Sequence, residues 1–505
     1  MPLASTRPEA TLPSVQSPSP LANARASTSL PPSALAACGV AAIALAAALA
    51  ANSVARLPLG LDRCYGLIVG LVLAVVLTTL IWPELSVPAI LIGAVVLDFQ
   101  LGGERVRHLV FVKLSLFACG AIGVAFANMK CRTRFVRVQT PGDAPAVCLV
   151  LYTAASAAYG YFVGGYALDS VAVAGYHLSQ LALYHFLVTT TLCRPASFRR
   201  AGTIVVLWSL VWIIPSLLTP GRGGGTASMW LIVLLCYATA SRSWWAPAAW
   251  AALPLALLDT LTSGYRTLWI GVAAQLGCLA TWGFKARLRQ LALASGVVLV
   301  LSVLTAALLI SQPSLLASVP AAATLNRFSA SFTSGGYRVP EALVGLEVFR
   351  QSPVFGSGVG YRTPPVWIET MGYMPTGPIH HLYYVSYLAN EGILGLALVF
   401  WYFLAVLFSR EARCLRQQAS ANPWAAFGVG LQAGLFGAIV AAFFSGPSDG
   451  HWTWGVLGAG SLLPAAWIAR HMTDSDPDAL QRELAFRRPA PRDLHETVSE
   501  SYGTG

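Results

Sequence analysis

The sequence predicts an all-α fold, namely a polytopic helical membrane protein with about 12–14 transmembrane helices and one large loop outside the bilayer. The first observation is composition: 56% of the 505 residues are hydrophobic and only 10% are charged, whereas about 25% of residues are charged in soluble domains. The second is that apolar runs of about 20 residues, the length that spans a bilayer, recur along most of the chain. Together they exclude a soluble enzyme, a disordered regulator and a nucleic-acid-binding domain.

Five regions follow one another along the chain. Residues 1–33 are rich in Pro, Ser and Ala without an apolar run, which predicts a disordered cytoplasmic tail. Transmembrane helices are expected over 34–312 and 381–469, on either side of a large polar loop at 313–380. Residues 470–505 are polar and charged, which predicts a second cytoplasmic tail. The apolar segments lie near 34–55, 64–82, 85–100, 108–129, 146–166, 171–192, 202–219, 227–241, 245–261, 267–284, 291–312, 383–408, 424–444 and 452–469. The span count before residue 129 stays open.

Basic residues give the third observation, because Lys and Arg gather in short clusters between apolar segments. The four clusters are Lys130, Arg132, Arg134 and Arg137; Arg194, Arg199 and Arg200; Lys285, Arg287 and Arg289; and Arg410, Arg413 and Arg416. An even number of predicted spans separates each cluster from the next, so all four are expected on the cytoplasmic side. The net charge of +11 therefore indicates topology and not a nucleic-acid partner. The nine cysteines form no CxxC pair, which argues against a zinc site or a disulfide framework.

The loop at 313–380 carries the pattern that favours an enzyme. It contains Arg338 and, fifteen positions later, the stretch PVFGSGVGY (353–361), and it leads into HHLYYVSYLANEGILGL (380–396). A loop of this length is usually functional or disordered, and its aromatic content argues against disorder. The stretch GSGVG has no βαβ unit around it, so we expect a tight backbone turn, near phosphate, and not a nucleotide loop.

These motifs resemble those of the O-antigen ligases and Wzy-type polysaccharide polymerases. The likeness lies in Arg338 before the glycine-rich stretch and in His381 eleven positions before Gly392, with Gly395 following. The stretch TSGYRTLWIG (262–271) places Arg266 at the start of a span, in a context similar to the family's. The resemblance covers about 255–400. One departure is Leu382, where the family prefers Asn, Ser or Gln.

The resemblance implies a bacterial inner-membrane glycosyltransferase with its large loop in the periplasm. It would move a glycan from an undecaprenyl-diphosphate carrier to an acceptor hydroxyl, without metal or cofactor. Two reactions stay open. A polymerase of exopolysaccharide, capsule or O-antigen is favoured slightly by Leu382, and the alternative is an O-antigen ligase that transfers to lipid A core. Membrane lipids, a chain-length regulator and a flippase are the implied partners. A solute or lipid transporter without chemistry is the competing class, which would predict internal repeats.

The candidate site residues follow from this chemistry. Arg266 and Arg338 would hold the diphosphate, because a guanidinium binds phosphate oxygens bidentately and stays charged. His381 would act as general base towards the acceptor hydroxyl. Glu391 lies about 15 Å further along a helix and is expected to pair with an interior Arg or hydroxyl. The remaining substrate-binding candidates are His380, Asp449 and His451. His177 and His185 are expected to pack or to form interhelical hydrogen bonds.

Overall fold

The structure, a computed structural model, describes part of the chain. The described residues are 78–91, 106–131, 137–198, 200–202, 266–282, 338–362, 366–368, 372–374, 382–420, 422–443 and 451–473, with scattered helical positions within 204–208, 255 and 289–304. All of them belong to one compact unit. The predicted tail at 1–33, most of the tail at 470–505, and the apolar segments at 34–55, 227–241 and most of 245–261 lie outside the described residues.

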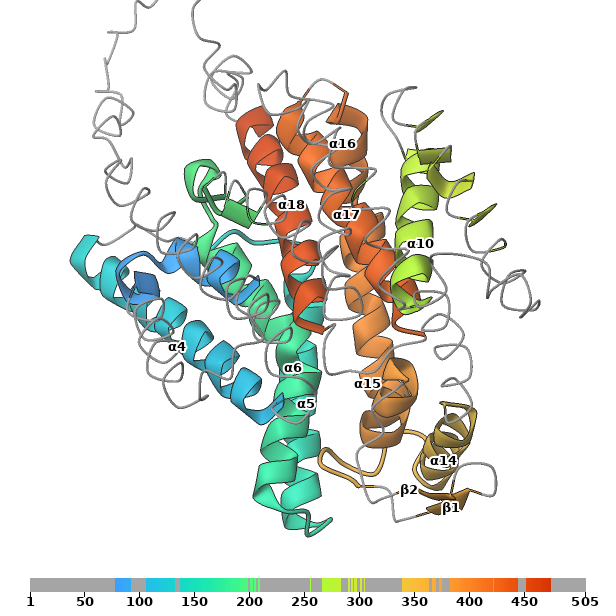
Figure 1. Cartoon of the computed structure of the whole chain (residues 1–505). Coiled ribbons are helices and arrows are strands. Elements are labelled where there is room, and N and C mark those ends of the chain that lie inside the picture. Colours follow the sequence, from blue (N-terminus) through green and yellow to red (C-terminus); the bar gives the residue numbers. More distant parts are fainter. Residues whose placement is uncertain are drawn as a thin grey trace, which may run out of the picture. The chain divides into compact units, whose positions relative to one another are not determined.

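Helices dominate the described residues, as the composition predicted (Figure 1). The helices are α4 (Val106–Cys131), α5 (Asp143–Phe162), α6 (Leu168–Thr191), α10 (Arg266–Trp282), α14 (Arg338–Gln351), α15 (Tyr383–Phe408), α16 (Arg410–Gln418), α17 (Pro423–Ala441) and α18 (His451–Thr473), with a 3₁₀ turn, η2 (Pro83–Leu85). The strands β1 (Val366–Ile368) and β2 (Gly372–Met374) form a small antiparallel hairpin that pairs Trp367 with Tyr373. Four helical stretches are long and apolar enough to cross a membrane: Asp143–Phe162, Leu168–Thr191, Tyr383–Gln418 and Trp424–Ala441. The prediction of a polytopic helical membrane protein is confirmed.

Two polar caps show why the last helices begin where they do. The Ser409 hydroxyl accepts a hydrogen bond from the Ala412 N–H at the start of α16. The Asn422 side chain accepts from the N–H groups of Trp424 and Ala425 at the start of α17, where Pro423 occupies the first turn. Both caps satisfy N–H groups that a helix start leaves unpaired, and proline suits the first turn because it lacks an N–H. The short polar helix α16 therefore connects α15 to α17 as a distinct element.

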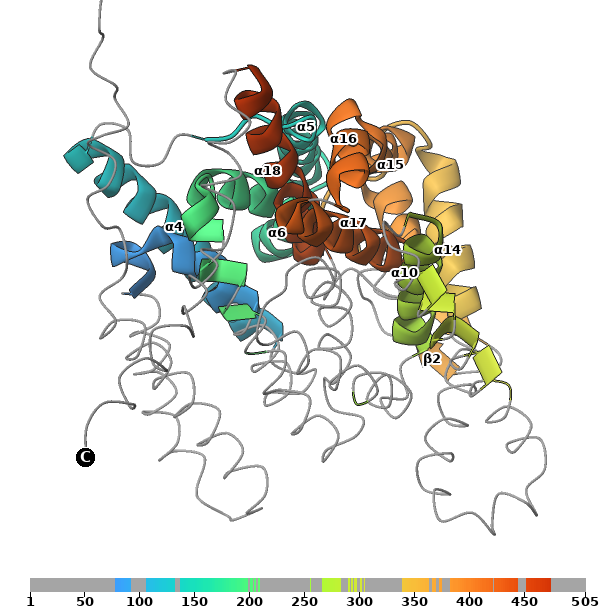
Figure 2. The same ribbon diagram turned by 90° about the horizontal axis from the view of Figure 1, so that it is seen from above.

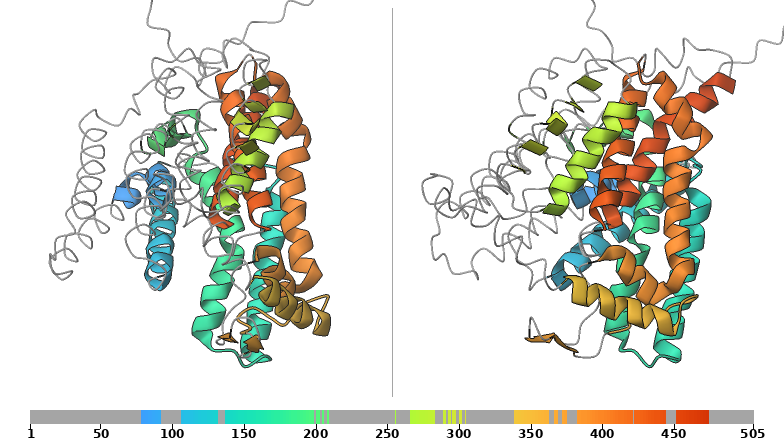
Figure 3. Two further views of the ribbon diagram at one scale, coloured as in Figure 1. Left: turned by 45° about the vertical axis from the view of Figure 1, so that its right-hand side comes forward. Right: turned by 90° about the vertical axis from the view of Figure 1, so that its right-hand side faces the viewer.

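The helices pack in two rows. In one row α18 lies between α6 and α17, and α17 lies between α18 and α10 (Figure 2). In the other, α5 packs on α6 and on α15, and α15 carries α14 (Figure 3). Glycines allow close approach of the helices, since a Cβ on Gly437 would lie 2.5 Å from the Gly271 carbonyl oxygen. Small residues at helix contacts are typical of membrane bundles, where close backbone packing stabilises association.

The described residues in or beside the basic clusters lie at one end of the bundle. Next to Arg137, the Val138 N–H donates to the Thr189 carbonyl, so the start of α5 meets the end of α6. The Trp467 indole N–H donates to the Cys193 carbonyl, which brings the last turns of α18 to the same end. Arg416 lies 4.7 Å from the ring centroid of Trp282, the last residue of α10. This common end agrees with the even span counts. The turn between α5 and α6 lies at the opposite end, whereas α10 and α18 begin partway along the bundle (Figure 1).

One predicted span is wrong in shape. Segment 383–408 was expected to be a single helix, but α15 reverses at Gly392, whose φ of 65° and ψ of −165° are not helical. The ring centroids of Tyr384 and Phe400 are 5.5 Å apart, whereas sixteen residues of straight helix separate two Cα atoms by about 24 Å. Residues 383–391 therefore form a half-helix that folds back against residues 393–408.

Candidate functional site

The half-helix 383–391 begins inside the bundle. Its first residue, Tyr383, is buried and lies 4.2 Å, between ring centroids, from Trp454 near the start of α18. The Tyr384 hydroxyl donates to the Ile439 carbonyl of α17 at 2.8 Å, and the Tyr387 hydroxyl donates to the Leu178 carbonyl of α6 at 2.8 Å. Three neighbouring helices therefore fix this segment, and the residue two positions before it is His381.

The glycine-rich loop 353–361 caps both sides of the break in α15. The half-helix ends on carbonyl groups that the loop satisfies, since Ser357 N–H donates to Ala389 at 2.9 Å and Gly358 N–H donates to Asn390 at 3.0 Å. The helix that follows starts on N–H groups that the loop also satisfies, since Ile393 donates to the Pro353 carbonyl at 2.9 Å. A break inside an apolar bundle leaves backbone groups that water cannot reach. The loop supplies their partners.

Positive φ angles explain the glycines of this loop. Gly356, Gly358 and Gly360 have φ values of 70°, 91° and 96°, a region that residues with a side chain rarely adopt. At Gly356 a Cβ would also lie 2.4 Å from the Asn390 carbonyl carbon. The expected tight turn is confirmed. The N–H groups of residues 356–359 and 361 all donate to carbonyl groups of the chain, so they are not available to a phosphate.

The loop is also held from the turn between α5 and α6. The Tyr166 hydroxyl donates to the Ser357 carbonyl at 2.8 Å. Burial is the main cause that raises the pKa of Tyr166 above its ordinary value, and the neighbouring Tyr361 and Tyr159 raise it further. The hydroxyl therefore keeps its proton and remains a donor. The loop also bonds to α5, because the Val359 N–H donates to the Ser156 carbonyl at 3.3 Å. The loop therefore contacts α15 on one side and the end of α5 on the other.

Glu391 lies at the end of the half-helix and is completely buried. Its Oε1 accepts a hydrogen bond from the Thr153 hydroxyl at 2.7 Å, and its backbone carbonyl accepts from the Tyr152 hydroxyl at 2.7 Å. Its Oε2 has no hydrogen-bond partner among the described residues. The carboxyl group lies over Gly395, where a Cβ would come within 2.5 Å of Oε2. The partner of Glu391 is thus a hydroxyl, one of the two kinds of partner that the sequence led us to expect.

Sequence reasoning missed the α5 residues of this site. Tyr152, Thr153 and Ser156 all bond to residues 390 and 391, and all three lie in the apolar segment 146–166. Tyr152 and Ser156 are four positions apart, which places them on one face of a helix. Polar side chains at helical spacing within an apolar segment were the signal that could have found them.

The predicted site residues are only partly described. Arg266 and Arg338 are the first residues of α10 and α14, and His451 is the first residue of α18, but their side chains lie outside the described part. His380, His381 and Asp449 also lie outside the described residues. The first turn of α18 lies beside the start of the half-helix, since the ring centroids of Trp454 and Tyr383 are 4.2 Å apart. The first turns of α10 meet the last turns of α17, where Gly271 approaches Gly437.

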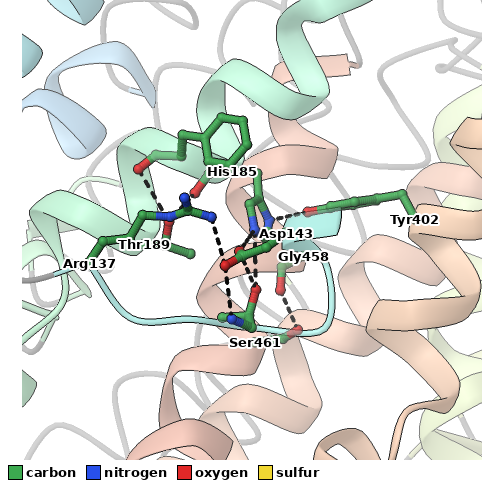
Figure 4. A network of polar contacts seen from close by, with 9 residues as sticks. Arg137, Asp143, His185, Thr189, Tyr402, Gly458 and Ser461 are labelled. Atoms are coloured by element: carbon green, nitrogen blue, oxygen red, sulfur yellow. Dashed lines mark hydrogen bonds and ion pairs between the residues drawn. The ribbon is translucent and has the colours of Figure 1, made fainter. Parts of the chain in front are cut away.

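A second polar network lies at the other end of the bundle (Figure 4). Asp143, the first residue of α5, pairs with Arg137 at 2.7 Å and with His185 Nε2 at 2.8 Å. The other ring nitrogen of His185 meets the Tyr402 hydroxyl at 2.9 Å. Thr140 donates to the Asp143 carboxylate at 2.9 Å. The predicted interhelical hydrogen bond of His185 is confirmed. This network joins α5, α6 and α15 where the basic clusters gather, away from the glycine-rich loop.

Comparison with known proteins bears on the loop end of the molecule. The sequence model of a protein family described as O-antigen ligase matches residues 251–400. The match covers less than a third of the chain, and it contains α10, α14, the glycine-rich loop, both strands and α15 as far as residue 400. The resemblance expected over about 255–400 is thereby confirmed. No curated protein matches the chain.

Proposed function

We propose, from this family match, that the chain is a membrane glycosyltransferase of the O-antigen ligase and polymerase type, working on a glycan carried by undecaprenyl diphosphate. The observation that carries the proposal is that the matched segment coincides with a built site. Within it the glycine-rich loop, a broken helix and buried Glu391 meet, directly after His381. A transporter would need no such single, loop-capped segment following a histidine.

The proposed chemistry assigns one role to each predicted residue. Arg266 and Arg338 hold the diphosphate of the donor, where their fixed charge stabilises the negative charge that develops on the leaving oxygen. His381 takes the proton from the acceptor hydroxyl as the new glycosidic bond forms. It precedes Leu382, the N-cap of the half-helix, and the positive end of a helix dipole favours the neutral, basic form of an imidazole. His380, Asp449 and His451 would contact the glycan.

The orientation that suits this reaction places the loop end in the periplasm. The described residues of the basic clusters lie at the opposite end, and clusters of Lys and Arg favour the cytoplasmic side. Cysteines introduced at Ser357 and at Ser420 should therefore be labelled by an impermeant thiol reagent from opposite sides of the inner membrane. Labelling of both from the same side would contradict the orientation.

The reaction is proposed to need no divalent metal, with the two arginines in its place. Asp-x-Asp pairs do occur, at Asp474–Asp476 and Asp476–Asp478, but they follow α18 in the tail after the cytoplasmic end of the bundle. Turnover should therefore persist in excess EDTA. Loss of turnover that magnesium or manganese restores would reject the two-arginine arrangement.

The decisive experiment profiles glycan length in a deletion strain complemented with variants. Loss of long chains with single repeats retained indicates a polymerase, whereas long chains that remain on the lipid carrier indicate a ligase. Arg266→Lys should be poorly tolerated, because lysine keeps the charge and loses the bidentate fork. His381→Ala should lower turnover by roughly 10²–10⁴-fold, and His380→Ala should be milder. Full activity of both Arg266→Lys and His381→Ala, at normal membrane levels, would remove support for these roles.

A further inference from the structure

We infer that Glu391 is a positioning residue for the proposed reaction, acting through its hydrogen bond to Thr153 to hold the half-helix 383–391 against α5. This inference rests on the proposed function. The half-helix is the element that follows His381, and its first residue is fixed inside the bundle by Trp454. Its last residue is Glu391, so the Thr153 bond fixes one end of a rigid segment whose other end adjoins the proposed base.

The geometry favours positioning over direct chemistry. Glu391 is completely buried, and its backbone lies eight positions along the helix from Tyr383, a rise of about 12 Å. Its carboxyl group faces Thr153 in α5 and the backbone at Gly395, which is the interior of the bundle and not the loop surface. Its effect on an acceptor hydroxyl would therefore pass through the placement of the half-helix.

Thr153 is the specific contact in this arrangement, because the other bonds around the break involve backbone groups. The loop satisfies the carbonyls of residues 389 and 390, and Tyr152 satisfies that of Glu391, whatever side chain stands at 391. The bond from Thr153 Oγ1 to Glu391 Oε1 is the one that depends on the side chain at position 391. Removal of the hydroxyl would leave a completely buried carboxyl group without a hydrogen bond from the described residues, and such a group cannot keep its place without cost.

The test compares matched threonine variants of the full-length protein in an assay with a lipid-linked glycan donor. Thr153→Val should lower kcat by roughly 10- to 100-fold, the effect of a displacement of about 1 Å at the reacting groups, while the donor KM changes less than about threefold. Thr153→Ser should restore most of kcat. The control Thr191→Val removes a buried hydroxyl whose hydrogen bond, among the described residues, is to the Leu187 carbonyl of its own helix, and it should leave kcat unchanged.

A double-mutant cycle separates the pair from general packing. Glu391→Ala should lower kcat as Thr153→Val does, and the double variant should be no slower than the slower single variant, because residues that act through one bond are not additive. Glu391→Gln keeps an acceptor oxygen and should retain most of kcat. Additive losses, failure of serine to restore kcat, or an equal loss in Thr191→Val would overturn the inference.

A structural measurement keeps the inference testable without turnover. In a background without native cysteines, Tyr384→Cys and Phe400→Cys should be joined efficiently by a short bifunctional thiol reagent, and Thr153→Val should lower that yield severalfold. The control pair, Ile393→Cys and Ser409→Cys, has the same spacing but lies about 24 Å apart along one helix and should not be joined. Absence of glycan transfer by the wild-type protein would refute the proposed function, whereas an unchanged cross-link yield in Thr153→Val would refute the positioning role.

Discussion

Gly392→Ala should destabilise the protein more than any other single methyl group added at the site. The backbone at Gly392 has φ 65° and ψ −165°, a combination that is essentially restricted to glycine and costs other residues about 1–3 kcal/mol. The added Cβ would also lie 2.3 Å from the Val354 carbonyl oxygen and 2.6 Å from the Gly356 nitrogen. The loop must then move away from the break.

The magnitude follows from the bonds that such a movement would break. The Ile393 N–H to Pro353 and Gly358 N–H to Asn390 bonds both cross the contact between loop and helix, and a buried backbone group left unpaired costs about 1–3 kcal/mol. Adding the backbone strain, we expect a loss of at least about 3 kcal/mol in the free energy of unfolding.

The assay is unfolding by SDS titration of the purified protein in mixed micelles, with Gly277→Ala as the control. Gly277 lies in α10 and is exposed, and a Cβ there meets nothing within 4 Å, so alanine should be neutral or stabilise by up to about 1 kcal/mol through helix propensity. An unfolding free energy of Gly392→Ala within about 1 kcal/mol of wild type would refute the account of the break, given the size of the expected strain.

Two further perturbations test the packing around α15. Gly395→Ala places a Cβ within 2.5 Å of Glu391 Oε2; it should lower turnover as Thr153→Val does, measured against the same Gly277→Ala control, and normal turnover would contradict the positioning role of Glu391. Tyr402→Phe leaves the buried His185 ring without its 2.9 Å hydroxyl partner; it should lower the unfolding free energy by about 1–3 kcal/mol without changing the donor KM, and a changed KM would mean that the network contacts the substrate.

The fold class and the polarity of the bundle could be predicted because they depend on coarse signals. Low charge and recurrent apolar runs suffice for a helical membrane class. Counting spans between basic clusters sufficed to bring Arg137 and Arg416 to one end, because each span reverses the direction of the chain. Neither prediction depends on which helices pack against one another.

The reversal in α15 could not be predicted in the same way. Residues 383–408 form one continuous apolar stretch, which contains an 18-residue window with a mean hydropathy of 2.2, so hydropathy does not distinguish a helix that turns back from one that continues. Gly392 and Gly395 look alike in sequence, yet only Gly392 leaves the helical conformation. The difference arises from the loop carbonyl at Val354, which approaches Gly392 from another part of the chain.

The partners of Glu391 and His185 were beyond prediction for a related reason. Thr153 and Glu391 are 238 positions apart, and Tyr402 and His185 are 217 apart. A single sequence holds no signal that joins such pairs. What it did show was the type of partner required, because a carboxyl group in an apolar segment needs a donor.

The order in which the chain is synthesised bears on how the broken helix reaches its fold. Tyr152 and Thr153 precede Glu391 by 239 and 238 positions, and the glycine-rich loop also leaves the ribosome before the half-helix. Every partner of the break that we have described in α5 and in the loop thus already exists when residues 383–391 emerge. The half-helix can dock onto a surface that is already assembled, and a nascent chain stalled after the loop has emerged, but before residue 383 has, would display that surface with its place for the half-helix still vacant.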